Sequence, residues 1–181
     1  MFGVILGTGV GGGIVINGDI VSGPNSIAGE WGHNPFPWIN EDEVPGCACY
    51  CGQSGCIETF LNGAGLAGIF PAKSYHATTL TALEIADLAE KNEAISIGVI
   101  EIYANRLARA LASVINILDP EVIVLGGGLS NIGRLYDLVP TLWQNWTFSD
   151  EISTKLIKNM HGDSSGVRGA AWLWPSDNEA G

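Results

Sequence analysis

Two stretches decide how this chain is organised: Gly29–His33 (GEWGH) and Cys47–Glu58 (CACYCGQSGCIE). The second stretch contains all four cysteines of the 181-residue chain. Such a concentration of thiols is typical of a tetrahedral zinc site, for which three cysteines and one histidine are a standard ligand set. It is also typical of paired disulfides in an oxidising compartment. If a metal binds, these residues leave open which three cysteines join His33.

The composition favours the metal. The first residues, Met1–Gly7, lack the basic region of a signal peptide, and no apolar run is long enough to cross a membrane. We therefore expect a reducing, cytoplasmic location, where clustered cysteines more often bind a metal than form disulfides. The formal net charge of −11 and the eight scattered Lys and Arg residues argue against nucleic-acid binding.

The N-terminal region reads as a hairpin. Phe2–Leu6 and Ile14–Val21 are apolar and rich in β-branched residues, which predicts two strands, with Asn17-Gly18 forming a tight turn inside the second run. The bend between them, Gly7–Gly13, is almost all glycine. Its bare backbone amides could approach a phosphate closely, with the Thr8 hydroxyl as a further donor.

This bend also contains a Gly-x-Gly-x-x-Gly spacing, at Gly7, Gly9 and Gly12. We reject a dinucleotide-binding interpretation, because that fold needs a helix directly after the glycines and here a strand follows. A plain glycine turn without a ligand is the alternative to the phosphate-binding hairpin.

The rest of the chain predicts an α/β fold. Residues 23–58 are rich in Gly, Pro and Cys and predict a long irregular loop, which a metal would pin. Periodicity and capping signals downstream predict further elements. Helices are expected over Ile57–Phe70, Thr81–Lys91, Glu93–Leu118 (capped by Asn92), Leu129–Trp143 and Gly166–Trp174, and strands over Glu121–Leu125 (covered on both faces) and Ile152–Met160.

A second glycine cluster follows the strand Glu121–Leu125. Its residues are Gly126, Gly127 and Gly128, and the next expected helix begins directly after them. A nucleotide at that helix N-terminus is one interpretation, and close packing of helix on strand is the other.

Two glutamates, Glu30 and Glu58, flank the expected metal loop. Carboxylates accept paired hydrogen bonds from vicinal hydroxyls such as those of sugars, although each is otherwise a solvated charge or a helix cap. A zinc ion with four protein ligands has no open position, so we expect a structural metal rather than a reactive one.

Together these motifs resemble the ROK family (repressors, open reading frames and sugar kinases). The resemblance rests on Gly29-Glu30-x-Gly32-His33, on Cys49-x-Cys51-Gly52-x-x-Gly55-Cys56-x-Glu58 and on the ending His161–Pro175. It covers essentially the whole chain, and Gly29–Trp38 is most similar to the loop of bacterial fructokinases.

The resemblance implies an actin-like ATPase (ribonuclease H-like) fold of two lobes with ATP between them, often dimeric. It implies a zinc site at His33, Cys49, Cys51 and Cys56, which leaves Cys47 as the spare cysteine. It implies sugar contacts from Glu30, His33 and Glu58, so that one nitrogen of His33 would face zinc and the other the sugar. Nucleotide-binding residues by the same resemblance are Gly7, Thr8, Gly9, Val10, Gly11, Gly12, Gly13, Gly126, Gly127 and Gly128.

One departure from the family pattern matters for activity. The family's first lobe carries an Asp-x-Gly-Gly-Thr phosphate loop and an Asn-Asp pair whose aspartate is the general base, and neither motif occurs here. We therefore expect residues 1–181 to be a C-terminal lobe, inactive alone, of a kinase that uses magnesium with ATP to phosphorylate a hexose, fructose first. The alternatives are an N-acetylglucosamine or glucose kinase, and the sugar-sensing domain of a ROK repressor. A homodimer formed through this lobe is also expected.

Overall fold

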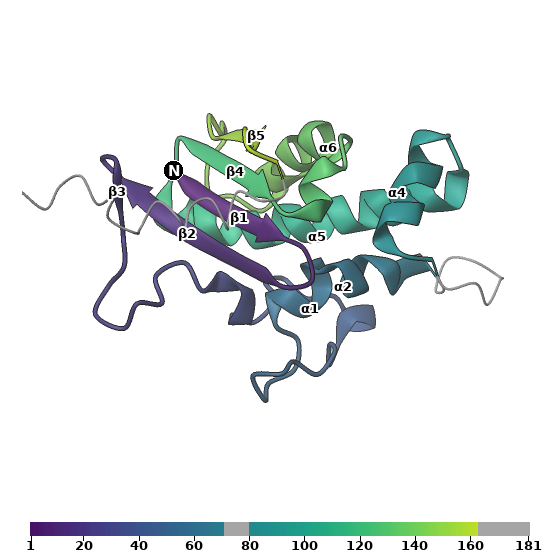
Figure 1. Ribbon diagram of the computed structural model, residues 1–181, viewed down its shortest axis with the longest axis horizontal. Helices are drawn as coiled ribbons and strands as arrows, with labels where there is room; N and C mark the ends of the chain where they lie inside the picture. Colours follow the sequence, from purple (N-terminus) through teal and green to yellow (C-terminus); the bar gives the residue numbers. More distant parts are fainter. Residues whose placement is uncertain (71–79, 163–181) are drawn as a thin grey trace, which may run out of the picture.

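The computed structural model describes residues 1–70 and 80–162 as a mixed five-stranded sheet with helices packed on it (Figure 1). The strand order is β3-β2-β1-β4-β5. β1 pairs antiparallel with β2 and parallel with β4, and β5 continues the parallel half. The strands are β1 (Phe2–Leu6), β2 (Val10–Ile16), β3 (Asp19–Ile20), β4 (Val122–Gly126) and β5 (Lys155–Lys158).

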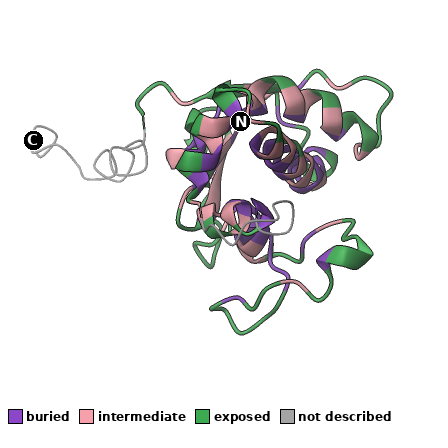
Figure 2. Cartoon of the chain, turned by 90° about the vertical axis from the view of Figure 1, so that its right-hand side faces the viewer, coloured by how far each residue is buried: buried purple, intermediate pink, exposed green. Residues whose placement is uncertain are grey.

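The longest helix, α5, forms the centre of the core. Most of its apolar side chains are buried, and they share one cluster with the inward-facing residues of β1 and β4 (Figure 2). None of the helices in the described residues is long and apolar enough to cross a membrane. The helices are α1 (Ile57–Leu61), α2 (Gly63–Ala67), α4 (Ala82–Glu90), α5 (Ala94–Leu118) and α6 (Leu135–Leu142).

Burial alternates along the strands. Phe2, Val4 and Leu6 are buried under the helices, whereas Ile5 on the opposite face is 39% exposed. β4 alternates likewise between buried and half-buried residues. The sequence predicted a sheet covered on both faces, but the described residues bury only one, and the all-apolar composition of β4 did not reveal this.

Two helix boundaries differ from the predictions because a side chain accepts hydrogen bonds from backbone N–H groups and caps a helix there. The helix expected over Ile57–Phe70 breaks at Asn62, whose side chain accepts a 2.7 Å hydrogen bond from the Gly65 N–H and caps a new helix. The cap of α5 is Glu93 rather than Asn92. Its carboxylate accepts from the backbone N–H groups of Ile95 and Ser96.

The second half of the chain differs from the predictions in two places, and a third prediction is not tested. A 3₁₀ helix, Gly128–Asn131, follows β4, so α6 begins at Leu135 and not directly after the glycines. The last strand is shorter than Ile152–Met160. The helix expected over Gly166–Trp174 lies outside the described residues.

The hairpin turn is tighter than the glycine run suggested. Only residues 7–9 form it, and Gly11, Gly12 and Gly13 continue as β2. Glycine is needed here because another segment of the same chain lies very close to the strand. A Cβ on Gly29, whose φ is +95°, would lie 2.6 Å from the Gly12 carbonyl oxygen. The segment that leads to His33 can therefore lie directly against β2.

Candidate metal and substrate site

His33 reaches the cysteines because two distant segments pair. His33 ends a 3₁₀ helix, Trp31–His33, that is held to the core where the Trp31 ring meets Phe2 edge to face. The next residues then run antiparallel to the chain around Cys56. The Phe36 N–H donates to the Gly55 carbonyl and the Ile57 N–H to the Asn34 carbonyl, each over 2.9 Å.

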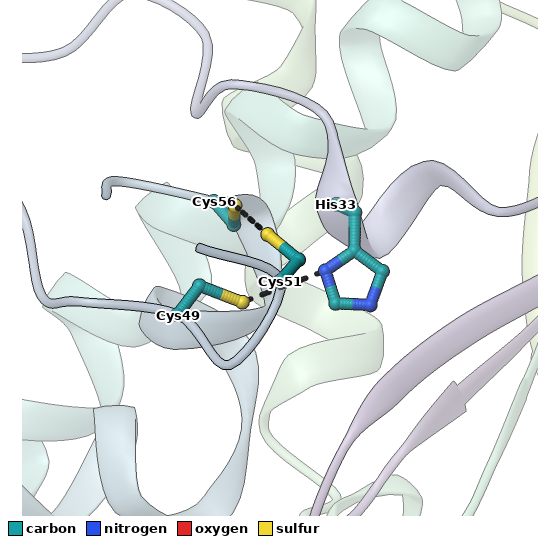
Figure 3. Close-up of side chains that lie close together, drawn as sticks. All are labelled: His33, Cys49, Cys51 and Cys56. Atoms are coloured by element: carbon teal, nitrogen blue, oxygen red, sulfur yellow. Dashed lines mark hydrogen bonds between the residues drawn. The ribbon is translucent and has the colours of Figure 1, made fainter. Parts of the chain in front are cut away.

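The four predicted metal ligands lie together in one cluster (Figure 3). Cys49 Sγ is 3.5 Å from His33 Nδ1, and Cys51 Sγ is 3.6 Å from Cys56 Sγ. All four ligand atoms lie within 4.8 Å of one another. Zn–S bonds of about 2.3 Å in a tetrahedron separate sulfur atoms by about 3.8 Å. The donor set and its spacing therefore fit zinc.

The thiols of this cluster are not equivalent. A hydrogen bond from the Gln53 backbone, with further help from Cys49 and Cys56, lowers the pKa of Cys51 to about 7. Burial, together with the neighbouring thiols, raises the pKa of Cys56 to about 12. One thiolate is thus available near neutral pH, and a bound cation would favour deprotonation of the others.

Cys47 lies outside this group. It is exposed, and it is absent from the cluster of close ligand atoms. Its carbonyl accepts a hydrogen bond from the Gly55 N–H, so its backbone supports the loop. The geometry thus matches the assignment of Cys47 as the spare cysteine.

A cavity of about 460 Å³ opens where the hairpin turn meets the cysteine loop. It brings together residues that were predicted for three different ligands: Thr8 and Gly9 for nucleotide, Glu58 for sugar and Cys49 for metal. The complete lining is Thr8, Gly9, Ala48, Cys49, Tyr50, Glu58, Thr59 and Asn62.

Glu58 joins the two sides of this cavity. It lies in the first turn of α1 and is 9% exposed. Its Oε2 accepts a 2.9 Å hydrogen bond from the Val10 N–H at the start of β2. The same oxygen would lie 2.9 Å from a Cβ on Gly9, so any other residue at position 9 would require the carboxylate or the turn to shift.

The two glycine clusters meet at one edge of the sheet. β1 and β4 are parallel, with Ile5 opposite Gly126, so the turn after β1 lies beside Gly127 and Gly128. Carboxyl ends of parallel strands are where ligands bind in open α/β sheets. Of the predicted nucleotide residues, Gly7, Thr8, Gly9 and Val10 share this edge with Gly126, Gly127 and Gly128, whereas Gly11, Gly12 and Gly13 run along β2 away from it.

Two of the predicted sugar contacts lie differently from Glu58. Glu30 is exposed and is not among the described residues that line the cavity. The second nitrogen of His33, Nε2, lies 2.8 Å from the Tyr50 hydroxyl, and the two rings meet edge to face with centroids 4.9 Å apart. Partial desolvation and the negative groups around it, first Glu58 and Cys49, raise the pKa of Tyr50.

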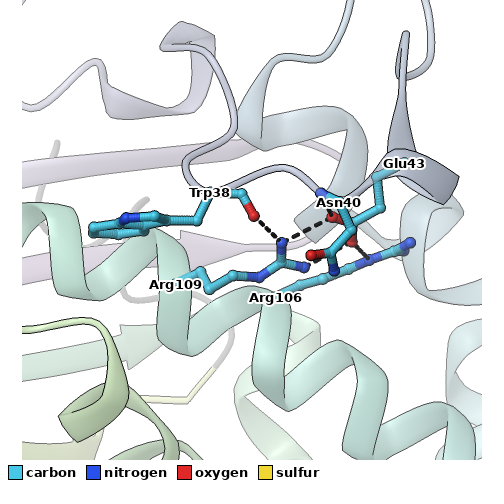
Figure 4. A network of polar contacts seen from close by, with 5 residues as sticks. All are labelled: Trp38, Asn40, Glu43, Arg106 and Arg109. Atoms are coloured by element: carbon cyan, nitrogen blue, oxygen red, sulfur yellow. Dashed lines mark hydrogen bonds and ion pairs between the residues drawn. The ribbon is translucent and has the colours of Figure 1, made fainter.

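A second network holds the other half of the loop (Figure 4). Glu43 accepts two hydrogen bonds from Arg109, of 2.7 and 2.8 Å, and one of 3.0 Å from Arg106. Arg109 also donates to the Trp38 carbonyl and stacks over the Phe36 ring at 4.6 Å. Burial raises the pKa of Glu43, but hydrogen bonds from Arg109 and the Asn40 backbone outweigh it and bring the value to about 2.

Sequence reasoning missed both Tyr50 and this ion network. Tyr50 stands between two predicted ligands, Cys49 and Cys51, and that position was a usable signal. Glu43 and Arg109 are 66 residues apart. In the sequence, Glu43 is one charge in a mostly polar segment, and Arg109 is one charge in a mostly apolar segment. Only the fold shows that they meet.

The family model named "ROK family" matches residues 1–177. The N-acetyl-D-glucosamine kinase of Photobacterium profundum is 40% identical over 177 residues, and that of Pectobacterium carotovorum 38% over 182. Among solved structures, a ROK family glucokinase from Streptomyces griseus, in complex with glucose and AMPPNP, matches with a TM-score of 0.80 and 25% identity.

The matches cover nearly all of this chain but only part of each relative. They span 96% of the chain and 58% of the Photobacterium kinase, and 95% of the chain and 59% of the Streptomyces glucokinase. The predicted α/β fold of the actin-like ATPase type is confirmed by these neighbours. Because the family model matches residues 1–177 of the 181-residue chain, the chain belongs to the ROK family.

Proposed function

We propose that this chain is the C-terminal lobe of an ATP-dependent hexose kinase. The observation that carries the proposal is the 460 Å³ cavity, in which the glycine turn, Glu58 and the cysteine loop meet at the carboxyl edge of the parallel strands. The relatives of 37–40% identity are named N-acetyl-D-glucosamine kinases, which supports the same reaction class.

The residues of this lobe would position the substrates. Amides of Thr8 and Gly9, together with Gly126–Gly128 at the end of the neighbouring strand, would hold the phosphates of ATP, since the Gly7 N–H donates to the Gly9 carbonyl within the turn. Magnesium that binds with ATP would neutralise charge on those phosphates. Zinc held by His33, Cys49, Cys51 and Cys56 would fix the loop that forms the sugar side. An aspartate from the other lobe is expected to take the proton of the sugar hydroxyl, so this chain alone would have little activity.

N-acetylglucosamine is the first candidate sugar, because the similar kinases carry that name. Fructose is the second, because Gly29–Trp38 resembles the loop of fructokinases. Glu58 would accept hydrogen bonds from sugar hydroxyls with the carboxylate oxygen that does not bind Val10. Contacts from Glu30 and His33 remain predictions, as do a cytoplasmic location and a homodimer formed through this lobe.

The test is a sugar panel on the full-length protein. N-acetylglucosamine, glucose, mannose and fructose are each supplied with magnesium and ATP, and ADP release is measured. We expect one hexose to exceed the others in kcat/KM. Binding of a sugar without any ADP release would instead favour the sugar-sensing repressor domain, and failure of all four sugars to bind or react would refute both.

A variant links this activity to the cavity. Glu58→Ala should lower kcat/KM about 100-fold. The variant loses both the hydrogen bond that holds the turn at Val10 and the carboxylate that would bind the sugar. Glu90→Ala, at an exposed position on α4, is the control and should leave the rate unchanged. Equal rates for the two variants would place the active site elsewhere.

A further inference from the structure

Tyr50 has a role at the metal site that the ligand set alone does not explain. Its hydroxyl lies 2.8 Å from Nε2 of His33, while Nδ1 of the same ring faces Cys49 Sγ at 3.5 Å. The two nitrogens of one imidazole are therefore engaged on opposite sides, by a phenol and by the thiol cluster. We propose that Tyr50 is a positioning residue, which fixes the tautomer and orientation of His33 for metal binding.

The tautomer follows from the geometry. A metal ligand must offer a lone pair, so Nδ1, which points at the sulfur atoms, carries no proton when it binds zinc. The proton of the neutral ring is then on Nε2, where it needs an acceptor. The Tyr50 oxygen is at hydrogen-bond distance from Nε2, so with zinc on Nδ1 the Nε2–H would donate to this oxygen. Such outer partners commonly orient histidine ligands and raise their basicity.

Backbone hydrogen bonds hold Tyr50 beside His33 although the Tyr50 side chain is exposed. Tyr50 is 84% exposed, so packing of its ring contributes little. However, it stands between the two ligands Cys49 and Cys51, within a turn closed by the bonds from Cys49 N–H to the Gln53 carbonyl and from Gly52 N–H to the Cys49 carbonyl. The residue that orients the histidine is thus fixed by the same cluster that the histidine completes.

This role bears on the sugar side, and there it rests on the proposed function. The resemblance to sugar kinases implied that the second nitrogen of His33 faces a sugar hydroxyl. Here that nitrogen already has an acceptor from its own chain, and Tyr50 also lines the cavity with Glu58. A sugar that reached His33 would replace the phenol oxygen with its own.

The test is the zinc affinity of the full chain, measured by chelator competition with zinc alone as the ligand. Tyr50→Phe keeps the ring and removes only the hydroxyl, and it should weaken zinc binding about tenfold. Tyr136→Phe is the matched control. It removes a hydroxyl that donates to the Ser130 carbonyl, outside the metal cluster, and should leave zinc affinity unchanged.

A second readout separates positioning from general stability. Long-range ¹H–¹⁵N correlation of His33 in the zinc-free chain should show the Nε2–H tautomer in the wild type and a mixture in Tyr50→Phe. The urea midpoints of the two zinc-free proteins should agree. Equal zinc affinity in Tyr50→Phe and wild type, or an unchanged tautomer, overturns the proposal.

The outcome is distinct from that of the kinase test. A wild-type chain that binds no zinc would overturn both the metal site and the role of Tyr50, whatever the sugar panel shows. A tenfold loss of zinc affinity in Tyr50→Phe would support the role even if no sugar were phosphorylated.

Discussion

The two halves of the loop between β3 and α1 are held in different ways. Residues 47–56 depend on a sulfur and imidazole cluster, and Cys51 and Tyr50 within it are exposed. Residues 36–43 depend on the pair of Glu43, in the loop, and Arg109, on α5, which are 7% and 1% exposed. Under the proposed zinc site, the first half would depend on an ion, whereas the second is held by side chains of the fold itself.

This difference teaches where each half draws its stability. A metal cluster contributes binding free energy that is absent from the unfolded chain, so it needs little packing. A buried ion pair lacks any such external source. It must satisfy every charged atom internally, because an unpaired buried charge is costly. The two terminal nitrogens of Arg109 meet that demand through Glu43 and the Trp38 carbonyl, and the guanidinium also stacks over Phe36, whereas its buried Nε has no hydrogen-bond partner among the described residues.

The largest expected effect is loss of the metal. Cys56→Ser should reduce zinc from about one per chain to none, because zinc in small protein sites contributes on the order of 10 kcal/mol of binding free energy. Hydrogen exchange should then speed up in residues 47–56, while α5 stays protected. Elemental analysis and exchange mass spectrometry measure both. Loss of protection in α5 as well would mean that the two halves are not independent.

Next in size is the ion network. Glu43→Gln should destabilise the chain by about 3–5 kcal/mol in urea unfolding, because the Arg109 charge stays buried without its partner. Glu90→Gln is the control. Its pair with Arg134 is 3.8 Å long and exposed, so the cost should stay below about 1 kcal/mol. The zinc content should remain about one per chain in both variants. A lower zinc content in Glu43→Gln would mean that the two halves of the loop are not independent.

The change in the stability contribution of Glu43 with pH should be slightly smaller than the effect of the Glu43→Gln variant. The pKa of Glu43 is about 2 in the folded chain, below its ordinary 4.5, so its contribution is fully present above about pH 4.5 and is lost as the pH falls toward 2. The stability difference between wild type and Glu43→Gln should shrink across this window by on the order of 3 kcal/mol. A difference that stays constant from pH 6 to 2.5 would contradict this assignment.

The smallest expected effect is at Cys47. Cys47→Ser should keep zinc at one per chain and change the unfolding free energy by less than about 0.5 kcal/mol, since the thiol is exposed and outside the cluster. Chelator competition and urea unfolding measure both quantities. Weaker zinc binding in this variant would make Cys47 a ligand after all.

Much of the fold was readable from the sequence because local patterns decide it. The β-branched runs of β1 and β4 and the apolar periodicity of α4 and α5 predicted these elements to within a few residues. Errors arose where one side chain redirects the backbone, as at Asn62 and Glu93. They also arose at Gly126–Gly128, where the expected helix start is a short 3₁₀ turn.

The candidate site was predictable in part, for a related reason. Cysteines spaced within one loop must meet, so the sequence pointed to the cluster, and the resemblance selected its members. The bond from Val10 to Glu58 depends on how separate segments pack, which no local pattern encodes. Tyr50 had a local signal in its position between two predicted ligands, although its contact with His33 also depends on that packing. The family assignment was correct, while the preference for fructose has less support than one for N-acetylglucosamine.

The hydrogen bond between Glu58 and the start of β2 has a consequence for how substrate preference can change during evolution. The Glu58 carboxylate holds the turn through its hydrogen bond with the Val10 N–H, and it also lines the cavity. Under the proposed function, replacing Glu58 to suit a different sugar would also remove the hydrogen bond that holds the turn. New specificities should then accumulate at other residues that line the cavity, such as Ala48 and Thr59.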